Sequence, residues 1–393
     1  MKAPNLLPSR RMQSVQNPII PVIGELSRAT PGTISLGQGV VYYGPPPGIL
    51  PAMVQTPNHD QYNGYGPVEG MPALLDKFAQ KLAQENGITT GKESRLLVTA
   101  GANMGFLNAL FTITDPGDEI ILPAPYYFNH EMAIRMLDCQ PVAVETDAQF
   151  QLDHAALEKS ISDRTRAIVT VSPNNPTGAV YSRESLLQVS NLCRKYGIYH
   201  ISDEAYEYFT YNGTEHFSPG SMHGAQSHTI SLFSMSKSYG FAGWRIGFMV
   251  LPAHLFDAVK KVQDTNLICP AQISQSAALL ALEAGSGYCR ERLERIGEVR
   301  ERIIESLLAI PEICRLPKTE GAFYLFMRIM TDMDDMTLVT RLIREYRVAV
   351  IPGNTFGMQN GCYIRAAYGA LDRQGSETGF QRLIDGLKGI INV

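Results

Sequence analysis

Short apolar runs alternate with longer amphipathic stretches through the middle of the chain. The apolar runs, each typical of a buried strand, fall at residues 95–99, 119–122, 141–144, 167–171, 198–201, 229–233 and 246–251. Between them, apolar residues recur at helical spacing in residues 72–85, 104–112, 127–137 and 183–196. Strands that alternate with helices predict an α/β fold whose mostly parallel sheet is covered by helices on both faces.

The pattern changes after residue 270. Residues 273–284 and 287–308 are long and helical, and the remaining chain mixes strands at 322–327, 348–351 and 362–366 with helices at 336–346 and 375–391. The first 50 residues are rich in Pro and Gly and predict an extended arm and loops. We therefore expect an N-terminal arm with a small-domain segment (1–48), a large α/β domain (49–285), and a connecting helix with a small α+β domain (286–393).

Composition excludes several classes of protein. The 393 residues are 45% hydrophobic and carry a net charge of -4, so no basic field is available for nucleic acid. No stretch approaches a membrane span, and the first residues lack the apolar core of a secretory signal, so we expect a cytoplasmic protein without a membrane partner. The six cysteines form no Cys-x-x-Cys pair and the histidines show no ligand spacing, so we expect no metal.

Polar residues follow four of the predicted strands. The motifs are Ala100-Gly-Ala-Asn103, Ser172-Pro-Asn-Asn-Pro-Thr-Gly178, Ser202-Asp-Glu-Ala-Tyr206 and Ser234-Met-Ser-Lys-Ser-Tyr-Gly240. Taken singly, each is more often a tight turn or a helix cap. Because ligands of open parallel sheets bind beyond the carboxyl ends of the strands, we expect these motifs to lie together.

The fourth motif contains a lysine whose position indicates a chemical role. An amine such as that of Lys237, at the mouth of a buried strand, can form a Schiff base with a carbonyl cofactor. Arg245 follows in Gly243-Trp-Arg-Ile-Gly-Phe248 and, with the nearby hydroxyls, suits an anionic group. A glycine turn that leads into a helix, as at Gly101, offers free N–H groups to a phosphate.

The order of these motifs resembles that of the class I/II aminotransferases, in the fold-type I family of pyridoxal phosphate enzymes. The resemblance runs from Ser35-Leu-Gly-Gln-Gly39 to Ile364-Arg365, nearly the whole chain. It implies pyridoxal 5′-phosphate as cofactor and the transfer of an amino group from an L-amino acid to a 2-oxo acid by a ping-pong mechanism. It also implies a homodimer with shared active sites.

The resemblance implies a role for each catalytic residue. Lys237 matches the lysine that holds the cofactor as an internal aldimine and then moves a proton between substrate Cα and cofactor C4′. Asp203 matches the acid that keeps the pyridine nitrogen protonated. Asn175 and Tyr206 match the pair that hydrogen-bonds the phenolic oxygen of the cofactor.

Other residues match the cofactor-binding and substrate-binding positions of the family. Tyr127 matches the aromatic residue that stacks on the ring, although its neighbour Tyr126 is an alternative, and Tyr65 matches a tyrosine that reaches the phosphate across the dimer interface. Arg365 matches the arginine that grips the substrate α-carboxylate, with Asn175 and the N–H of Gly39 beside it. The resemblance implies a phosphate site formed by Gly101, Ala102, Asn103, Ser234, Ser236 and Arg245.

The chain departs from the family pattern after Gly39. The segment Val40-Val-Tyr-Tyr-Gly-Pro-Pro-Pro47 replaces a short segment that usually borders the substrate side chain. Tyr42 and Tyr43 suit an apolar or aromatic substrate, or simply close a lid. The donor and the acceptor therefore stay open.

Two other functions remain possible at this point. The first is a C–S or β-lyase that uses the same cofactor, because a fold does not fix a reaction. The second, less favoured, is a non-enzymatic sensor. Such proteins carry a DNA-binding extension, whereas the residues before about 35 have no helix-turn-helix pattern or basic patch.

Overall fold

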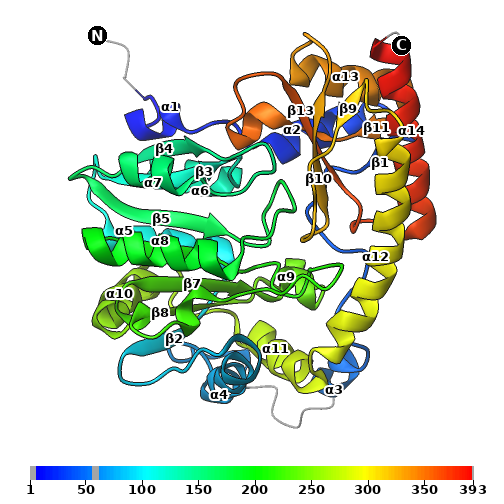
Figure 1. Cartoon of the computed structure of the whole chain (residues 1–393). Helices are drawn as coiled ribbons and strands as arrows, with labels where there is room; N and C mark the ends of the chain where they lie inside the picture. Colours follow the sequence, from blue (N-terminus) through cyan, green and yellow to red (C-terminus); the bar gives the residue numbers. More distant parts are fainter. Residues whose placement is uncertain (1–5, 55–61, 392–393) are drawn as a thin grey trace, which may run out of the picture.

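A seven-stranded sheet forms the centre of the computed structural model, which describes residues 6–54 and 62–391 (Figure 1). Its strands are β2 (Ser94–Thr99), β3 (Glu119–Ala124), β4 (Gln140–Glu145), β5 (Thr165–Val171), β6 (Tyr199–Asp203), β7 (Thr229–Ser234) and β8 (Gly247–Pro252). Their order is β2-β8-β7-β6-β5-β3-β4, and β8 runs antiparallel to both of its neighbours. The remaining pairs are parallel, which confirms the predicted mostly parallel sheet.

Helices cover both faces of this sheet because its strands are apolar on both sides. Leu232 of β7 belongs to one hydrophobic core and its neighbour Phe233 to the core on the opposite face. On the first face lie α5 (Ala102–Ile113), α6 (Phe128–Met136) and α10 (Phe256–Asn266). On the second face lie α4 (Pro72–Lys81), α7 (His154–Lys159), α8 (Arg183–Tyr196) and α11 (Gln272–Ala284).

The C-terminal part builds a smaller, antiparallel sheet. Its strands β9 (Cys314–Arg315), β10 (Tyr324–Ile329), β12 (Ile351–Pro352) and β13 (Cys362–Ala367) lie in the order β12-β13-β10-β9. Helix α12 (Gly287–Leu308) runs along one side of the molecule toward this sheet, which α13 (Asp335–Tyr346) and α14 (Arg373–Ile391) accompany (Figure 1). The fold class is therefore confirmed, while the proposed domain boundaries at 48/49 and 285/286 stay a prediction.

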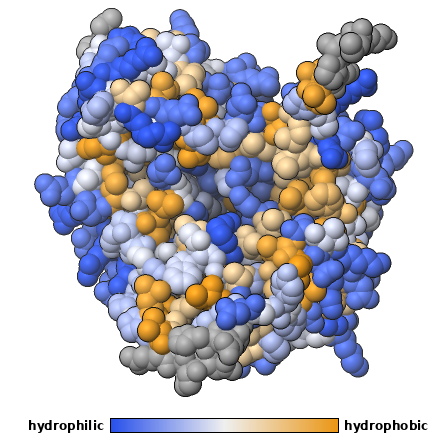
Figure 2. All heavy atoms as spheres, turned by 180° about the vertical axis from the view of Figure 1, so that it is seen from behind, coloured by the Kyte–Doolittle hydropathy of each residue, from blue (hydrophilic) through white to orange (hydrophobic). Residues whose placement is uncertain are grey.

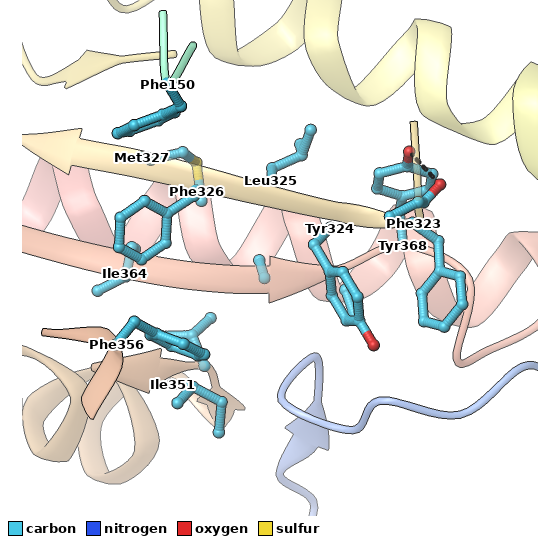
Figure 3. Close-up of a cluster of buried hydrophobic side chains, with 14 of the residues drawn as sticks. Phe150, Phe323, Tyr324, Leu325, Phe326, Met327, Ile351, Phe356, Ile364 and Tyr368 are labelled. Atoms are coloured by element: carbon cyan, nitrogen blue, oxygen red, sulfur yellow. Dashed lines mark hydrogen bonds between the residues drawn. The ribbon is translucent and has the colours of Figure 1, made fainter. Parts of the chain in front are cut away.

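Aromatic side chains fill the space around the smaller sheet (Figure 3). The ring of Phe326 lies 5.7 Å from that of Phe356 and 5.4 Å from that of Tyr363. Tyr324, on the same strand as Phe326, points instead toward the N-terminal segment (Figure 3). Its hydroxyl lies so close to Gly39 that a Cβ on this glycine would approach it to 2.9 Å. The small sheet thus places the Tyr324 hydroxyl beside Gly39, which was predicted to bind the substrate.

The prediction of a helix-free N-terminal region was wrong. The segment contains α1 (Arg10–Ser14) and α2 (Ile19–Arg28), followed by β1 (Ile34–Ser35), which pairs with β11 (Val348–Ala349). Pro21 does not break α2, since it lies in the first turn, where its missing N–H has no helical partner to lose.

The helix predicted at residues 72–85 also changes character before its end. Helix α4 stops at Lys81, and a π-helical turn, η2 (Leu82–Asn86), continues to Gly87, which closes it with a φ of 67°. Such turns are rare inside proteins and are frequently found near functional sites.

Candidate active site

A cavity of about 110 Å³ lies at the carboxyl ends of β5, β6 and β7. Most of the residues singled out from the sequence line it, which places the strand-end motifs together as expected for a parallel sheet. The lining residues are Ala102, Asn103, Tyr127, Val171, Asn175, Asp203, Ala205, Tyr206, Ser234, Ser236, Lys237 and Arg245.

One corner of the cavity is rich in hydrogen-bond donors. Helix α5 begins at Ala102, after Gly101, whose φ of 81° is easily adopted only by glycine. A Cβ on Gly101 would also stand 2.3 Å from Nη2 of Arg245, so the guanidinium packs directly on this turn. Arg245 Nη1 donates to Ser236 Oγ over 3.3 Å. The first N–H groups of an α-helix lack intrahelical partners, and together with Arg245 they suit an anion such as phosphate.

Asp203 is the last residue of β6 and lines the cavity. Its Oδ1 accepts a hydrogen bond from Ala205 N over 3.0 Å, and its Oδ2 lies 3.2 Å from Nε2 of His130. The direction of this second approach is not that of a hydrogen bond, since neither ring nitrogen of His130 has a hydrogen-bond partner among the described residues. A buried carboxylate requires a positive or donating partner, and beyond Ala205 N a ligand in the cavity can supply one.

His130 was missed by the sequence analysis. It lies on α6, its ring stacks on Phe106 with centroids 4.0 Å apart, and its backbone N–H donates to Tyr127 O. The available signal was its position three residues after Tyr127 at the start of a predicted helix, a spacing that brings the two side chains onto one face.

A chain of hydrogen bonds links the cavity to the small sheet. Asn175 Nδ2 donates to the hydroxyl of Tyr206 over 3.3 Å, and that hydroxyl also shares a hydrogen bond of 2.8 Å with the hydroxyl of Tyr324. Arg365 Nη1 donates to Asn175 Oδ1 over 2.8 Å. Burial, followed by the neighbouring Tyr324, raises the pKa of Tyr206 well above its usual value, so its hydroxyl stays protonated. Tyr324 is a second residue that the sequence analysis missed.

Arg365 is a buried cation, only 2% exposed. Its guanidinium lies 4.5 Å from the centre of the Tyr324 ring, and its Nη2 donates to Gly37 O over 2.8 Å. It forms no ion pair with any carboxylate in residues 6–54 or 62–391, and its Nε has no hydrogen-bond partner there. Because a buried charge is stable only when it is compensated, this guanidinium suits an anionic ligand.

Lys237 occupies the short helix α9 (Met235–Ser238), directly after β7. Its Nζ donates to the carbonyl oxygen of Gly39, and the hydroxyl of Tyr43 donates to the carbonyl oxygen of Lys237 over 3.0 Å. Burial lowers the pKa of Lys237 to about 8, with Arg365 and Arg245 adding to the shift and Asp203 opposing it. The amine therefore loses its proton at a lower pH than an ordinary lysine does.

The structure distinguishes Tyr127 from its neighbour Tyr126 and shows where Tyr42 and Tyr43 lie. Tyr127 lines the cavity, whereas Tyr126 packs beside Gly357, whose added Cβ would meet its ring at 2.4 Å. Tyr42 and Tyr43 do not line the cavity, and their rings contact each other edge-to-face at 5.3 Å. The segment they belong to packs against the turn after Lys237, so it encloses this side of the site.

Tyr65 lies apart from the other predicted residues. It is 84% exposed and does not line the cavity of its own chain.

The described residues contain no group of three or more His, Cys, Asp or Glu side chains placed to hold a metal ion. None of the helices within these residues is long and apolar enough to cross a membrane.

A lysine amine, an acid and a donor-rich helix end lie together around one cavity at one edge of a mostly parallel sheet. The model of the family "Aminotransferase class I and II" matches residues 31–383. The chain belongs to this family and is an aminotransferase, which sets aside the non-enzymatic sensor.

Named relatives agree with this assignment. The Aromatic aminotransferase ISS1 of Arabidopsis thaliana is 32% identical over 98% of this chain and 97% of its own. An aspartate aminotransferase of Pyrococcus abyssi is 32% identical over 77% of this chain and 79% of its own. The solved structure of an aspartate aminotransferase double mutant of Thermus thermophilus superposes with a TM-score of 0.88 at 29% identity, covering 97% of this chain and 99% of that one.

The pKa of Lys237 predicts how the stability of the cofactor-free protein depends on pH. The folded pKa of about 8 lies below the unfolded value of roughly 10.4, so the folded state binds fewer protons between these pH values. The free energy of unfolding should therefore rise with pH across this window, by at most about 3 kcal/mol from this group. Urea unfolding of the wild type and of Lys237→Ala, both free of cofactor, measures this contribution as a difference. A difference that stays flat across the window would contradict the assigned pKa.

Proposed function

We propose that this aminotransferase binds pyridoxal 5′-phosphate and moves an amino group from an L-amino acid to a 2-oxo acid in two half-reactions, as in a ping-pong mechanism. The observation that carries the proposal is the grouping of Lys237, Asp203 and the donor-rich turn at Gly101 around one cavity. The cofactor has three parts that need partners. Its aldehyde carbon requires an amine, its pyridinium nitrogen requires an acid, and its phosphate requires an anion site. The residues present fit all three parts of this cofactor.

The cofactor is proposed to be held by its phosphate and through a covalent bond to Lys237 Nζ. The phosphate would take the first N–H groups of α5, the hydroxyls of Ser234 and Ser236, and the guanidinium of Arg245. Tyr127, Val171 and Ala205 offer apolar walls to the ring. When bound, the cofactor supplies a carbonyl that accepts the amino group and a protonated ring that accepts the electrons of the broken Cα–H bond.

Lys237 is proposed as the general base. A base works best when its pKa lies near the working pH, and burial brings that of Lys237 to about 8. After substrate has displaced it, Nζ would take the proton from substrate Cα and deliver it to the C4′ atom of the cofactor. In the structure, Nζ donates to the carbonyl oxygen of Gly39.

Asp203 and Tyr206 are proposed to adjust the ring from two sides. The carboxylate of Asp203, with His130 behind it, would keep the ring nitrogen protonated. The protonated hydroxyl of Tyr206 and the amide of Asn175 would donate to the ring oxygen.

Arg365 is proposed to bind the α-carboxylate of the substrate. Its guanidinium is buried, planar and free of any described acidic partner, which favours a two-point contact with a carboxylate. Asn175, which accepts a hydrogen bond from Arg365, and the N–H of Gly39 would complete the carboxylate site. One end of the substrate would thus be fixed while Cα faces Lys237.

A homodimer with shared sites is also proposed. Tyr65 is exposed and remote from its own cavity, as expected of a side chain that completes the phosphate site of a second copy. Large apolar side chains are exposed elsewhere, among them Leu50, Phe111 and Ile273. Figure 2 shows that hydrophobic residues reach the surface in several patches on the face turned away in Figure 1.

The six free cysteines support the cytoplasm as the proposed location.

A panel of single amino acids tests the proposed function. The purified enzyme, loaded with pyridoxal 5′-phosphate, is mixed with aromatic, dicarboxylic and aliphatic donors, and the cofactor absorbance is followed. We expect competent donors to convert the cofactor to its amine form with one equivalent of the matching 2-oxo acid, and a second 2-oxo acid to reverse the change. Pyruvate with ammonia, or an olefin, would identify a lyase instead. No response to any donor would contradict the proposal.

A further inference from the structure

A ring of hydrogen bonds lies behind the turn that carries Asp203 and Tyr206. Within this turn, Glu204 and Glu207 do not line the cavity. Ser218 Oγ donates to Glu204 Oε2, and Asn86 Nδ2 donates both to Ser218 Oγ over 2.9 Å and to Glu207 Oε2 over 2.8 Å. Because the backbone joins Glu204 to Glu207, these four residues form a closed circuit, which we call the Asn86 ring.

Glu204 and Ser218 of the Asn86 ring are buried, Asn86 and Glu207 are half-buried, and both carboxylates have partners. Glu204 is 1% exposed, and its Oε2 lies 2.9 Å from Nε2 of His216. Lys81 pairs with Glu207 and donates to Asn86 Oδ1 over 2.7 Å. Breaking this largely water-excluded network would leave the buried groups of Glu204 and Ser218 without partners, so its geometry is specified.

Three separate parts of the chain meet in the Asn86 ring. Asn86 ends the π-helical turn η2, which follows α4, and Ser218 precedes the short 3-10 helix η3 (Pro219–Ser221). Glu204 and Glu207 follow β6. None of the four side chains lines the cavity, so the ring cannot contact a ligand there directly.

The Asn86 ring complements the backbone bonds of the turn. Glu204 N donates to Leu232 O over 2.8 Å, which ties the beginning of the turn to β7. The side-chain ring ties the far end of the turn, at Glu207, to Asn86 and back to Glu204. Tyr206 lies between these two anchored positions, and Asp203 directly precedes the first.

We propose that the Asn86 ring is a positioning device for the aminotransferase reaction. Glu207 N donates to Glu204 O over 3.0 Å, so the turn holds its own shape, and the ring anchors it to η2 and to the segment before η3. This anchoring sets the orientation of Asp203 and Tyr206 toward the cofactor. This inference rests on the proposed function, because both residues act there on the cofactor ring. Asn86, Ser218, Glu204 and Glu207 are positioning residues, since they act only through the turn.

The test compares two serine substitutions. Ser218→Ala removes the hydroxyl shared by Glu204 and Asn86. Ser190→Ala is the matched control, since Ser190 is also buried and its Oγ lies 3.0 Å from a histidine nitrogen, that of His228, but it lies on α8 and takes no part in the ring. Both variants are loaded with pyridoxal 5′-phosphate. The readouts are the pH titration of the absorbance of the Lys237-bound cofactor, and kcat and KM for one donor.

We expect Ser218→Ala to raise the midpoint of the absorbance titration by about half a pH unit or more, because a loosened Tyr206 stabilises the deprotonated form less well. Its kcat should fall about 10-fold with little change in KM, since misorientation affects the reacting atoms rather than carboxylate binding. Ser190→Ala should change neither, and Ser218→Thr, which keeps a hydroxyl, should restore both. Asn86→Ala, at a partly exposed position, should shift the midpoint in the same direction and serves if Ser218→Ala does not fold.

Equal midpoints in Ser218→Ala, Asn86→Ala and the wild type would overturn the proposal, as would an equal shift in Ser190→Ala. A wild-type enzyme without cofactor titration or half-reaction would instead overturn the proposed function. The two failures are therefore distinguishable before the variants are compared.

Discussion

Lys237→Ala should lose transamination by about 10⁴-fold or more, because one substitution removes both the covalent attachment of the cofactor and the proposed general base. The fold should survive, since the amine contributes one hydrogen bond, to Gly39 O, and its burial opposes folding below pH 8. Turnover of the best donor and thermal unfolding measure the two effects.

A chemical readout separates attachment from catalysis in this variant. Borohydride reduction followed by peptide mass analysis should find the cofactor fixed to the peptide of Lys237 in the wild type and nowhere in the variant. The matched control is Lys260→Ala, which removes a partly exposed lysine paired with Glu69 at 3.4 Å. Turnover of Lys237→Ala within about 10-fold of this control would contradict the role of Lys237.

Asp203→Asn should slow removal of the substrate Cα proton by about 100-fold or more. The amide is nearly isosteric with the carboxylate but carries no charge, so the ring nitrogen of the cofactor would lose the anion that favours its protonated state. The amide oxygen can still accept from Ala205 N, so the turn should keep its shape. Exchange of the Cα proton of a donor into deuterated water measures this step without the later ones.

Asp118→Asn provides the control for this charge removal. Asp118 is also buried and accepts from Arg166 Nε over 2.9 Å, but it does not line the cavity. We expect it to cost stability without slowing proton exchange. Near-normal exchange in Asp203→Asn would show that the acid does not tune the ring.

Much of the candidate site could be predicted because its residues follow strands in short motifs. Asn175, Asp203 and Lys237 each lie within a few residues of a strand end, and parallel strands bring these ends to one edge. His130 and Tyr324 could not be found this way, since they reach the site from α6 and β10. Whether Tyr65 enters a second copy stays a prediction.

Helices with strong amphipathic periodicity were predicted correctly, whereas α2 and α10 were missed. The predicted helices at 183–196 and 287–308 agree with α8 and α12. Helix α2 was missed because the Pro and Gly content of the first 50 residues predicted an arm and loops, although Pro21 lies in the first turn of the helix. Helix α10 was not predicted at all.

The sequence by itself determined the alternation of strands and helices, the strand-end motifs and, through their order, the resemblance to a family. Periodicity records which faces of an element are buried, and this is a local property. The tertiary structure alone decided that β8 runs antiparallel, that Lys237 has a pKa near 8 and that Glu204 belongs to the Asn86 ring. These properties depend on neighbours distant in sequence, because burial and pairing are set by every segment that packs against a group.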